Sequence, residues 1–409
     1  MQSTIDFVNT PVVDVVNQII LDAAKMGTSD IHFDHTDSCL KIRIRIDGIL
    51  NDYADVPNNV KNNVITRIKI ISGMNITETR LPQDGAIKTT LGGMDLDMRV
   101  SSLPTKKGEK IVIRILDYSR SLQGIEYLFF SEDNYKKVLK MLAEPNGIIL
   151  VTGATGSGKS TTVYSFLQKL NVKGSNLITV EDPVEMDIEG INQVQVNSEI
   201  GLDFATVLRS ILRQDPNVIM IGEIRDSETA QIAVRASITG HLVLSTLHTN
   251  NSLTTIERLL DMEVERYLLA SALSGVVSQK LARKLCDKCK KVRPTTTYEK
   301  EMFKKFLNMD VENIYSPVGC PECAGGYHGR IAIQEVLLIS PEIRDAINAK
   351  IPKAELRNMV YNSDVITLLQ DGLYKVLAGF TSIEEIIKLT ESDDEINAET
   401  RIKSITNDN

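Results

Sequence analysis

The chain has 409 residues, 42% of them hydrophobic and 24% charged, a composition typical of a globular protein with two or three domains. Its formal net charge is −8 and no long run of Lys and Arg occurs, so no nucleic-acid partner is expected. No apolar stretch approaches the ~20 residues that span a bilayer. Residues 1–6 lack the basic start and apolar core of a signal peptide, so we expect a cytoplasmic chain, or one peripheral to a membrane on its cytosolic side.

Residues 1–117 have the pattern of a small α+β domain. Apolar residues at helical spacing predict a helix over 11–26, with Gly27 as its C-cap. Residues 40–46 alternate apolar and basic side chains up to the Asp47-Gly48 turn, as a half-buried strand does. We expect a mostly antiparallel sheet. A second helix is predicted at about 58–72. A further strand is predicted to start at residue 29, and three more to span 85–91, 94–101 and 110–116.

A linker is predicted at 118–124, and a larger α/β domain at 125–391. Ser131 is placed to cap a helix that ends before Pro145. Apolar segments that alternate with helical ones predict a doubly wound sheet, in which 191–196 could also pair antiparallel. The predicted strands lie near 148–152, 176–180, 191–196, 217–221 and 242–246. The domain is expected to include a cysteine-containing subdomain at 281–335 and a helical part at 340–391, with a disordered tail at 392–409.

The segment Gly153-Ala154-Thr155-Gly156-Ser157-Gly158-Lys159-Ser160 matches the phosphate-binding P-loop pattern. It follows the apolar run 148–151 and precedes a predicted helix, which is the context this loop requires. Lys159 is expected to reach the β- and γ-phosphates, and the Ser160 hydroxyl to hold Mg2+. The chain is therefore predicted to bind ATP or GTP through Thr155, Gly156, Ser157, Gly158, Lys159, Ser160 and Thr161.

A carboxylate ends the apolar strand predicted at 217–221. Glu223 follows Gly222, which stands where an ordinary Walker B strand has its Mg2+-binding Asp. We predict that Glu223 is the general base that activates water. The alternative is a carboxylate that only stabilises the first turn of the next helix.

Two further polar clusters follow apolar strands. Glu181, Asp182 and Glu185 could hold Mg2+ through water or position the nucleophile, or they could form a polar loop broken by Pro183. His241 and His248 bracket the strand near 242–246. A histidine beside a core is usually a buried group with satisfied hydrogen bonds. A nucleotide-linked role is the alternative, and the sequence favours it more for His248 than for His241.

An arginine beside the γ-phosphate is expected to stabilise the charge that develops during hydrolysis. Spacing does not select one among the candidates Arg99, Arg114, Arg209, Arg213 and Arg225.

Cysteine spacing predicts a metal site. Cys286 and Cys289 form one Cys-x-x-Cys pair, and Cys320 and Cys323 form a second. Four thiolates at this spacing match tetrahedral zinc and leave no open coordination position, so a structural Zn2+ is expected. Four free thiols are the alternative. The long gap between the pairs predicts a small helical insertion, and 281–335 is accordingly a zinc-binding subdomain.

Several motifs in one order resemble the cytoplasmic ATPases of type II secretion and type IV pili, over about residues 21–390. These motifs are Ser29-Asp30-Ile31-His32, Arg45-Ile46-Asp47-Gly48, Arg80-Leu81-Pro82-Gln83-Asp84-Gly85, Arg99-Val100-Ser101, the P-loop, Glu181-Asp182-Pro183-Val184-Glu185, Gly222-Glu223-Ile224-Arg225-Asp226 and Thr239-Gly240-His241. The resemblance implies a RecA-like P-loop ATPase domain preceded by a smaller, PAS-like α+β domain.

The resemblance also implies roles for particular residues. It makes the 181–185 cluster the family's "Asp box" and the 239–250 segment its "His box", and it explains Gly222. It implies that Arg99 and Arg114 reach the γ-phosphate when the two domains close, and that the chain forms a homohexamer. With these roles, Glu181, Glu185 and His248 join the predicted nucleotide-binding residues.

Two departures refine the expected function. Retraction motors of the family lack the tetracysteine, so its presence favours assembly. The chain starts almost directly in the domain beside the ATPase core, so the extra N-terminal platform-docking domain of many assembly motors is expected to be missing. We predict an ATP-hydrolysing hexameric motor, at the inner face of the cell membrane, that moves an inner-membrane platform. The alternatives are a retraction ATPase and, from another class, a nucleic-acid translocase.

Overall fold

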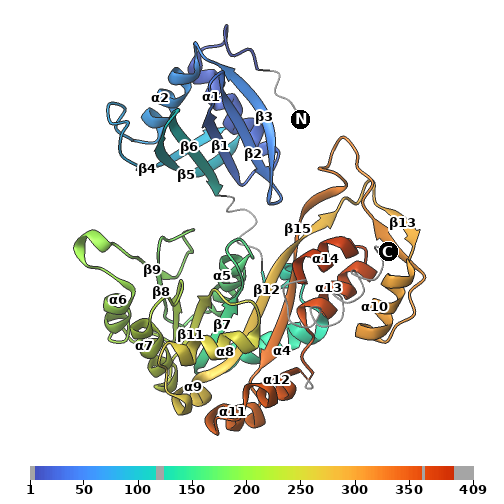
Figure 1. The fold of residues 1–409 in the computed structure, drawn as a ribbon. Helices are drawn as coiled ribbons and strands as arrows, with labels where there is room; N and C mark the ends of the chain where they lie inside the picture. Colours follow the sequence, from blue (N-terminus) through green and yellow to red (C-terminus); the bar gives the residue numbers. More distant parts are fainter. Residues whose placement is uncertain (1–4, 117–123, 362–363, 391–409) are drawn as a thin grey trace. The chain divides into compact units, whose positions relative to one another are not determined.

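The computed structural model describes residues 5–116, 124–361 and 364–390 (Figure 1). The chain divides into two compact units, residues 1–120 and 121–409, which are described separately below. Most of the linker predicted at 118–124, and the whole of the tail predicted at 392–409, lie outside the described residues.

The first unit is a six-stranded antiparallel sheet with two helices, in the strand order β3-β2-β1-β6-β5-β4. This is the mostly antiparallel α+β unit expected from the sequence. The Gly92-Gly93 turn joins the strands predicted at 85–91 and 94–101, which pair antiparallel. Its elements are α1 (Val12–Lys25), β1 (Asp30–His35), β2 (Cys39–Ile46), β3 (Ile49–Pro57), α2 (Lys61–Ile71), β4 (Gln83–Leu91), β5 (Met94–Thr105) and β6 (Gly108–Leu116).

The two faces of this sheet differ in chemistry because side chains alternate along each strand. One face presents apolar residues such as Phe33 and Ile113, which form a single buried core with α1 and α2. The other face carries mostly charged and polar residues, including Asp30, Asp34 and Arg114. The unit therefore has one packed face and one face able to bind charged groups.

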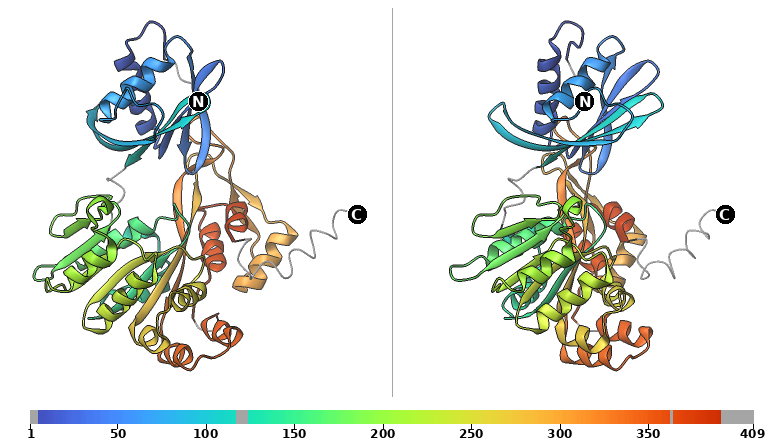
Figure 2. Two further views of the ribbon diagram at one scale, coloured as in Figure 1. Left: turned by 60° about the vertical axis from the view of Figure 1, so that its left-hand side comes forward. Right: turned by 90° about the vertical axis from the view of Figure 1, so that its left-hand side faces the viewer.

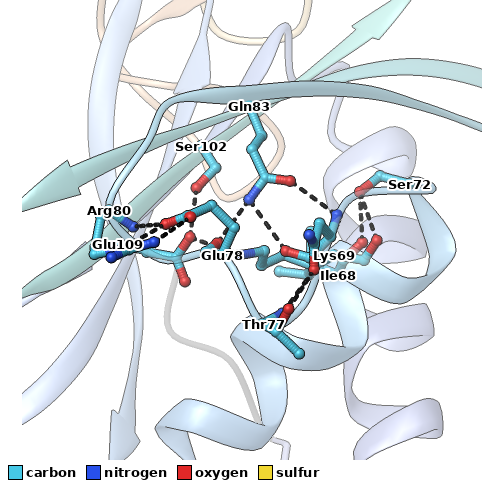
Figure 3. Close-up of polar contacts among 10 residues, drawn as sticks. Ile68, Lys69, Ser72, Thr77, Glu78, Arg80, Gln83, Ser102 and Glu109 are labelled. Atoms are coloured by element: carbon cyan, nitrogen blue, oxygen red, sulfur yellow. Dashed lines mark hydrogen bonds and ion pairs between the residues drawn. The ribbon is translucent and has the colours of Figure 1, made fainter.

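A buried ammonium fixes the segment between α2 and β4 (Figure 3). Lys69 Nζ donates to Glu109 Oε1 at 2.7 Å and to the carbonyl of Glu78 at 2.7 Å. Ser102 Oγ donates to the same Glu109 oxygen at 3.1 Å. Gln83 Nε2 donates to the Glu78 carbonyl from the other side, at 2.8 Å. The segment that carries the Arg80–Gly85 motif is thus tied to both the helix and the sheet.

The second unit is built on a seven-stranded sheet in the order β15-β12-β7-β11-β10-β8-β9. The strands from β12 to β9 run parallel to their neighbours, and β15 pairs antiparallel with β12. The strands are β7 (Gly147–Thr152), β8 (Leu177–Glu181), β9 (Asn192–Gln195), β10 (Val218–Ile221), β11 (Leu242–Leu247), β12 (Leu273–Leu285) and β15 (Tyr327–Leu338).

Helices cover both faces of this sheet. Ile148 and Leu150 point into one apolar core that includes residues of α6, α7, α8, α9, α11 and α12, while α5 packs on β7 and β11 and α4 on β15. Ser131 accepts a hydrogen bond from the Asn134 amide and caps α4, as predicted. The helical elements are η1 (Ile125–Leu128), α4 (Glu132–Leu142), α5 (Lys159–Leu170), η2 (Ser198–Ile200), α6 (Phe204–Ile211), α7 (Ser227–Ile238), α8 (Ser252–Asp261), α9 (Arg266–Ala272), α11 (Pro341–Asn348) and α12 (Lys353–Tyr361).

Two features of the sheet differ from the sequence analysis. The antiparallel option for 191–196 is wrong, because β9 pairs parallel with β8. The sheet also gains β12 and β15, which the sequence did not predict as strands of this sheet. Both continue past the last pairing with β7 as a two-stranded ladder that leads to the cysteines (Figure 2). Residues 281–285 and 327–335, assigned to the zinc-binding subdomain, are therefore the ends of sheet strands.

A third core lies beside this ladder. It joins Ala282 and Ile331 of the two strands to apolar residues of α10, α13 and α14. The helix α10 is the insertion predicted between the cysteine pairs. The elements here are β13 (Lys291–Pro294), α10 (Thr297–Leu307), β14 (Asn313–Ser316), α13 (Leu368–Leu377) and α14 (Ile383–Thr390).

Within the ranges that the structure describes, we found no helix that is both long and apolar enough to cross a bilayer.

Candidate nucleotide and metal sites

The P-loop connects the buried strand β7 to α5, at the carboxyl edge of the sheet. Gly153 has φ +148°, and a Cβ there would lie 2.4 Å from the carbonyl oxygen of Gln279, so only glycine fits. At the N-terminus of α5, Gly158 gives no side-chain cap to the first turn. Ser157 Oγ is buried and has no hydrogen-bond partner in the described structure. Donors at a helix N-terminus that lack protein acceptors suit a phosphate group.

Lys159 lies inside the loop. Its Nζ donates to the carbonyls of Gly153 at 2.9 Å and Ala154 at 3.0 Å. Burial lowers the pKa of the Lys159 ammonium, and the negative charge of Glu223 opposes that shift. Ser160 and Thr155 are exposed and Thr161 is half-buried. The loop thus holds a positive charge that protein carbonyls solvate when no phosphate is present.

Gln279 of β12 fixes the shape of the loop. Its Nε2 donates to the carbonyl of Ser157 at 2.7 Å, and its Oε1 accepts from Thr162 Oγ1 of α5 at 2.8 Å. The side chain is fully buried. No local pattern marks Gln279, because its contacts lie more than one hundred positions away and β12 itself was not predicted.

Glu223 lies beside the P-loop after β10. Arg225 Nη2 donates to Glu223 Oε1 at 2.5 Å, and His248 Nε2 lies 3.4 Å from Oε2. Burial raises the pKa of the Glu223 carboxyl, but the hydrogen bond and charge of Arg225, with His248 and Lys159, outweigh burial and lower that pKa. Glu223 is therefore a carboxylate at neutral pH, one-fifth exposed and surrounded by positive groups.

The two histidines lie at opposite ends of β11. His248 follows its carboxyl end and contacts Glu223. His241 precedes its amino end, where Nδ1 lies 2.9 Å from the carbonyl of Ala236 and the His241 carbonyl accepts from the amide of Gly147. Gly147 begins β7, whereas the P-loop follows its end, so the structure brings His248 to the site and leaves His241 at the far edge.

The acidic segment after β8 has one buried and several accessible carboxylates. The buried Glu181 accepts from Thr179 Oγ1 at 2.6 Å, from Gln193 Nε2 at 3.0 Å and from the hydroxyl of Tyr164. Burial and the charge of Glu181 raise the pKa of that tyrosine, so it remains a donor. The backbone amide of the half-buried Glu185 donates to the same Tyr164 oxygen at 3.2 Å. Glu181 thus orders the segment that carries Glu185.

The candidate arginines lie in three places. Arg225 contacts Glu223 and, at 3.3 Å, Asp182. Arg209 and Arg213 lie at the end of α6, where Arg209 pairs with Glu228 and Arg213 donates to the carbonyl of Arg209 at 2.8 Å. The remaining two belong to the first unit. Arg99 on β5 and Arg114 on β6 are direct cross-strand neighbours.

The four cysteines converge at the end of the β12–β15 ladder, and their Sγ atoms all lie within 4.8 Å of one another. Cys286 and Cys320 are 3.9 Å apart, Cys289 and Cys323 3.7 Å, and Cys320 and Cys323 3.6 Å, measured between sulfur atoms. Tetrahedral zinc with Zn–S bonds of about 2.3 Å requires sulfur atoms about 3.8 Å apart. Neither 3.6 nor 3.9 Å is a disulfide distance, and the donor set fits one four-coordinate metal ion.

Comparisons with known proteins agree with this geometry. Residues 8–388 match the family model described as Type II/IV secretion system protein. The chain is 44% identical over 380 residues to the "Putative type II secretion system protein E" of Escherichia coli, covering 93% of this chain and 77% of that protein. It is 44% identical over 385 residues to the "Type IV pilus assembly ATPase PilB" of Pseudomonas aeruginosa, covering 93% and 68%.

Solved structures share the architecture. The pilus retraction motor PilT with bound ADP superposes with a TM-score of 0.63 at 25% identity, covering 93% of this chain and 98% of that one. The ATPase DotB of Legionella pneumophila reaches a TM-score of 0.70 at 20% identity, covering 96% and 99%, and supports the fold alone. The predicted fold class, a P-loop ATPase domain preceded by a smaller α+β domain, is confirmed.

The Gln279 contacts generate a first test. Gln279→Glu replaces the donor to the Ser157 carbonyl with a buried negative charge beside the phosphate-binding loop. We expect the Kd for an ATP analogue to rise by tenfold or more, which corresponds to about 1.4 kcal/mol. Binding of a fluorescent nucleotide to the full chain measures it. Lys280→Met is the matched control, because the next residue on β12 bonds to the carbonyl of Leu389 instead. Equal affinity in wild type and Gln279→Glu would contradict the role of Gln279.

Proposed function

Because this chain belongs to the type II/IV secretion system protein family and is an ATPase, we propose that it is a hexameric motor for pilus or pseudopilus assembly. ATP hydrolysis would move an inner-membrane platform protein to which subunits are added. The observation that carries the proposal is a P-loop lysine and an ionised carboxylate placed at the same carboxyl edge of the second unit's sheet. Lys159 follows β7 and Glu223 follows β10 of this sheet, and each charge favours the charged form of the other. The charge of Glu223 opposes the lowering of the pKa of Lys159 by burial, and the charge of Lys159 helps to lower the pKa of Glu223.

Nucleotide binding would begin with an exchange of partners. The phosphates would replace the carbonyls of Gly153 and Ala154 as acceptors for Lys159, and they would give Ser157 Oγ the acceptor that it lacks. The amides of Gly156, Gly158, Ser160 and Thr161, with Thr155 at the rim, complete the proposed phosphate contacts.

The hydroxyl and carboxylate oxygens beside the P-loop are the kind of ligand that Mg2+ prefers. The exposed Ser160 hydroxyl is its proposed protein ligand, and Asp182 and Glu185 lie on the nearby acidic segment as acceptors for bound water. Mg2+ would neutralise charge on the phosphates. We assign Glu181 a positioning role, since its two oxygens already accept three side-chain hydrogen bonds.

Hydrolysis requires a base and compensation for developing charge. The lowered pKa of Glu223 keeps it able to accept a proton from water at neutral pH. His248, beside Glu223, is proposed to sense whether the γ-phosphate is present. Arg99 and Arg114 of the first unit are proposed to stabilise the transferring phosphoryl group when the units close on ATP. Arg225 is proposed to help Arg99 and Arg114 compensate this charge, because its guanidinium already bonds to Glu223 and Asp182 beside the P-loop.

The cysteine cluster supports a structural Zn2+ at the tip of the second unit's longest ladder. Such an ion would join the two ends of β12 and β15 and supply folding energy there. The cluster and the similarity to assembly ATPases favour assembly over the retraction function named for PilT. The net charge of −8 argues against a nucleic-acid translocase. Peripheral association with the cytoplasmic face of the membrane follows from the proposed platform partner.

Replacing the proposed base tests the chemistry. Glu223→Gln keeps the shape of the side chain but removes its ability to accept a proton. We expect kcat to fall by about 10²-fold or more, with ATP affinity changed less than about threefold. Phosphate release and nucleotide binding by the purified chain measure both. Glu257→Gln, a carboxylate of α8 paired with Lys353, is the control. Near-wild-type hydrolysis by Glu223→Gln would remove Glu223 from the mechanism.

Metal analysis tests the cysteine cluster. We expect about one zinc ion per chain, and the double variant Cys286→Ser/Cys289→Ser should lose it. Because the proposed metal fixes the ends of β12 and β15, we expect faster amide hydrogen exchange there after zinc removal. Cys39→Ser is the control, since Cys39 lies in the first unit. Purified protein with well under one zinc per chain and an unaltered exchange pattern would exclude the site.

Gene deletion separates assembly from retraction. Loss of surface pili or of secreted substrate after deletion is the expected result, because an assembly motor is needed to add subunits. Excess pili would identify a retraction motor instead. Purified chain should hydrolyse ATP faster with the cytoplasmic part of the platform protein and not with DNA or RNA. Stimulation by nucleic acid alone would favour the translocase.

A further inference from the structure

Four charged residues form a straight row across the open face of the first unit's sheet. The register places Arg45 opposite Asp30, Asp30 opposite Arg114, and Arg114 opposite Arg99, on the neighbouring strands β2, β1, β6 and β5. Three arginines and one aspartate share this row. Directly opposed like charges such as Arg114 and Arg99 destabilise a sheet on their own, and Asp30, opposite Arg114 on the other side, compensates part of this charge.

Asp30 is fixed at the centre of the row. Its side chain is only 10% exposed, whereas that of Arg114 is 64% exposed. Ser29 Oγ donates to Asp30 Oδ2 at 2.9 Å, and Arg45 Nε lies 3.6 Å from the same oxygen. Asp30 Oδ1 accepts from Arg114 Nε at 3.0 Å. A buried, ordered carboxylate therefore holds a largely exposed guanidinium by one defined atom.

Asp30 holds Arg114 through Nε, and this choice of atom determines which nitrogens of the guanidinium remain available to a ligand. A guanidinium has five N–H donors in one plane, and the bond to Asp30 uses the single donor on Nε. The terminal Nη groups stay on the outer edge of the plane, where they can donate to two phosphate oxygens. Lysine in place of Arg114 would lack the planar pair of terminal nitrogens that can donate to two phosphate oxygens in parallel.

We infer that Asp30 is a positioning residue for hydrolysis, which fixes the guanidinium of Arg114 in one orientation before ATP arrives. The inference rests on the proposed function, in which Arg114 acts on the transferring phosphoryl group. Pre-ordering matters because a long exposed side chain otherwise loses rotamer freedom on binding, and a misplacement of about 1 Å can cost up to 10²-fold in rate. Asp30 would thus raise kcat without touching the nucleotide.

Asp34 provides a matched control on the same strand and face. It lies four residues from Asp30, is similarly shielded, and pairs with Arg43 at 2.6 Å and with Lys110. Neither of these partners is proposed to act on ATP. Asp30→Asn and Asp34→Asn both remove one partly buried charge from the sheet, so they should perturb its stability alike, and only the former should disturb Arg114.

The test is a double-mutant cycle on ATP hydrolysis by the full chain, with thermal unfolding measured in parallel. We expect Asp30→Asn to lower kcat about tenfold, with KM within about twofold, and Asp34→Asn to match wild type. In an Arg114→Ala background, Asp30→Asn should cause no further loss, because the arginine that it orients is gone.

Two results would overturn the inference and can be told apart from failure of the proposed function. Wild-type kcat in Asp30→Asn, with impaired Arg114→Ala, refutes the positioning role alone. Equal losses from Asp30→Asn in both backgrounds show that Asp30 acts through the general stability of the sheet. Wild-type hydrolysis by Arg114→Ala removes that arginine from the proposed mechanism, and the role of Asp30 falls with it.

Discussion

The hydrogen bonds of the Gln279 carboxamide hold the phosphate-binding loop of the second unit in place. The carboxamide joins the P-loop carbonyl of Ser157 to Thr162 of the following helix, so loop, helix and β12 are held as one body. The same strand continues to Leu285, next to the zinc-ligand candidate Cys286. Seven residues of extended chain span about 23 Å. The phosphate-binding loop is therefore linked by one strand, β12, to the chain segment that carries Cys286.

The partner strand β15 needs protection because it forms the edge of the sheet. Side chains of the helices α4 and α13 bond to three of its backbone groups. Asn134 Nδ2 donates to the carbonyl of Gln334, and the backbone amide of Gln334 donates to the carboxylate of Asp371. Lys375 Nζ donates to the carbonyl of Ala332. An uncovered edge of this length is a template for unwanted strand pairing. Asp371 and Lys375 are buried and paired at 2.6 Å, so removal of either one alone leaves a buried charge.

Local patterns in the sequence predict five of the six strands of the first unit, the P-loop and the cysteine set, because each depends on neighbouring residues or on a characteristic spacing, but they miss β3. β12 and β15 escape prediction because their pairing joins segments about fifty residues apart, across the cysteine insertion. Gln279 escapes for the same reason, since its acceptor on the P-loop is 122 positions away. For Glu181, the sequence indicates a carboxylate near the nucleotide, while the contacts reveal that both oxygens are already occupied. Roles in catalysis, including those of Glu223, Arg99 and Arg114, stay predictions.

The cations singled out in the two units share one feature, because protein acceptors already hold them in the structure. In the second unit, Lys159 and Arg225 already bond to protein acceptors. A triphosphate that displaces those acceptors gains only the difference between old and new bonds. In the first unit, Asp30 Oδ1 likewise accepts from Arg114 Nε at 3.0 Å. The Arg114 side chain is 64% exposed, much as that of Arg225 is 56% exposed. For the cations of both units, the free energy gained from an anion is therefore the difference between the bonds that it forms and those that it displaces.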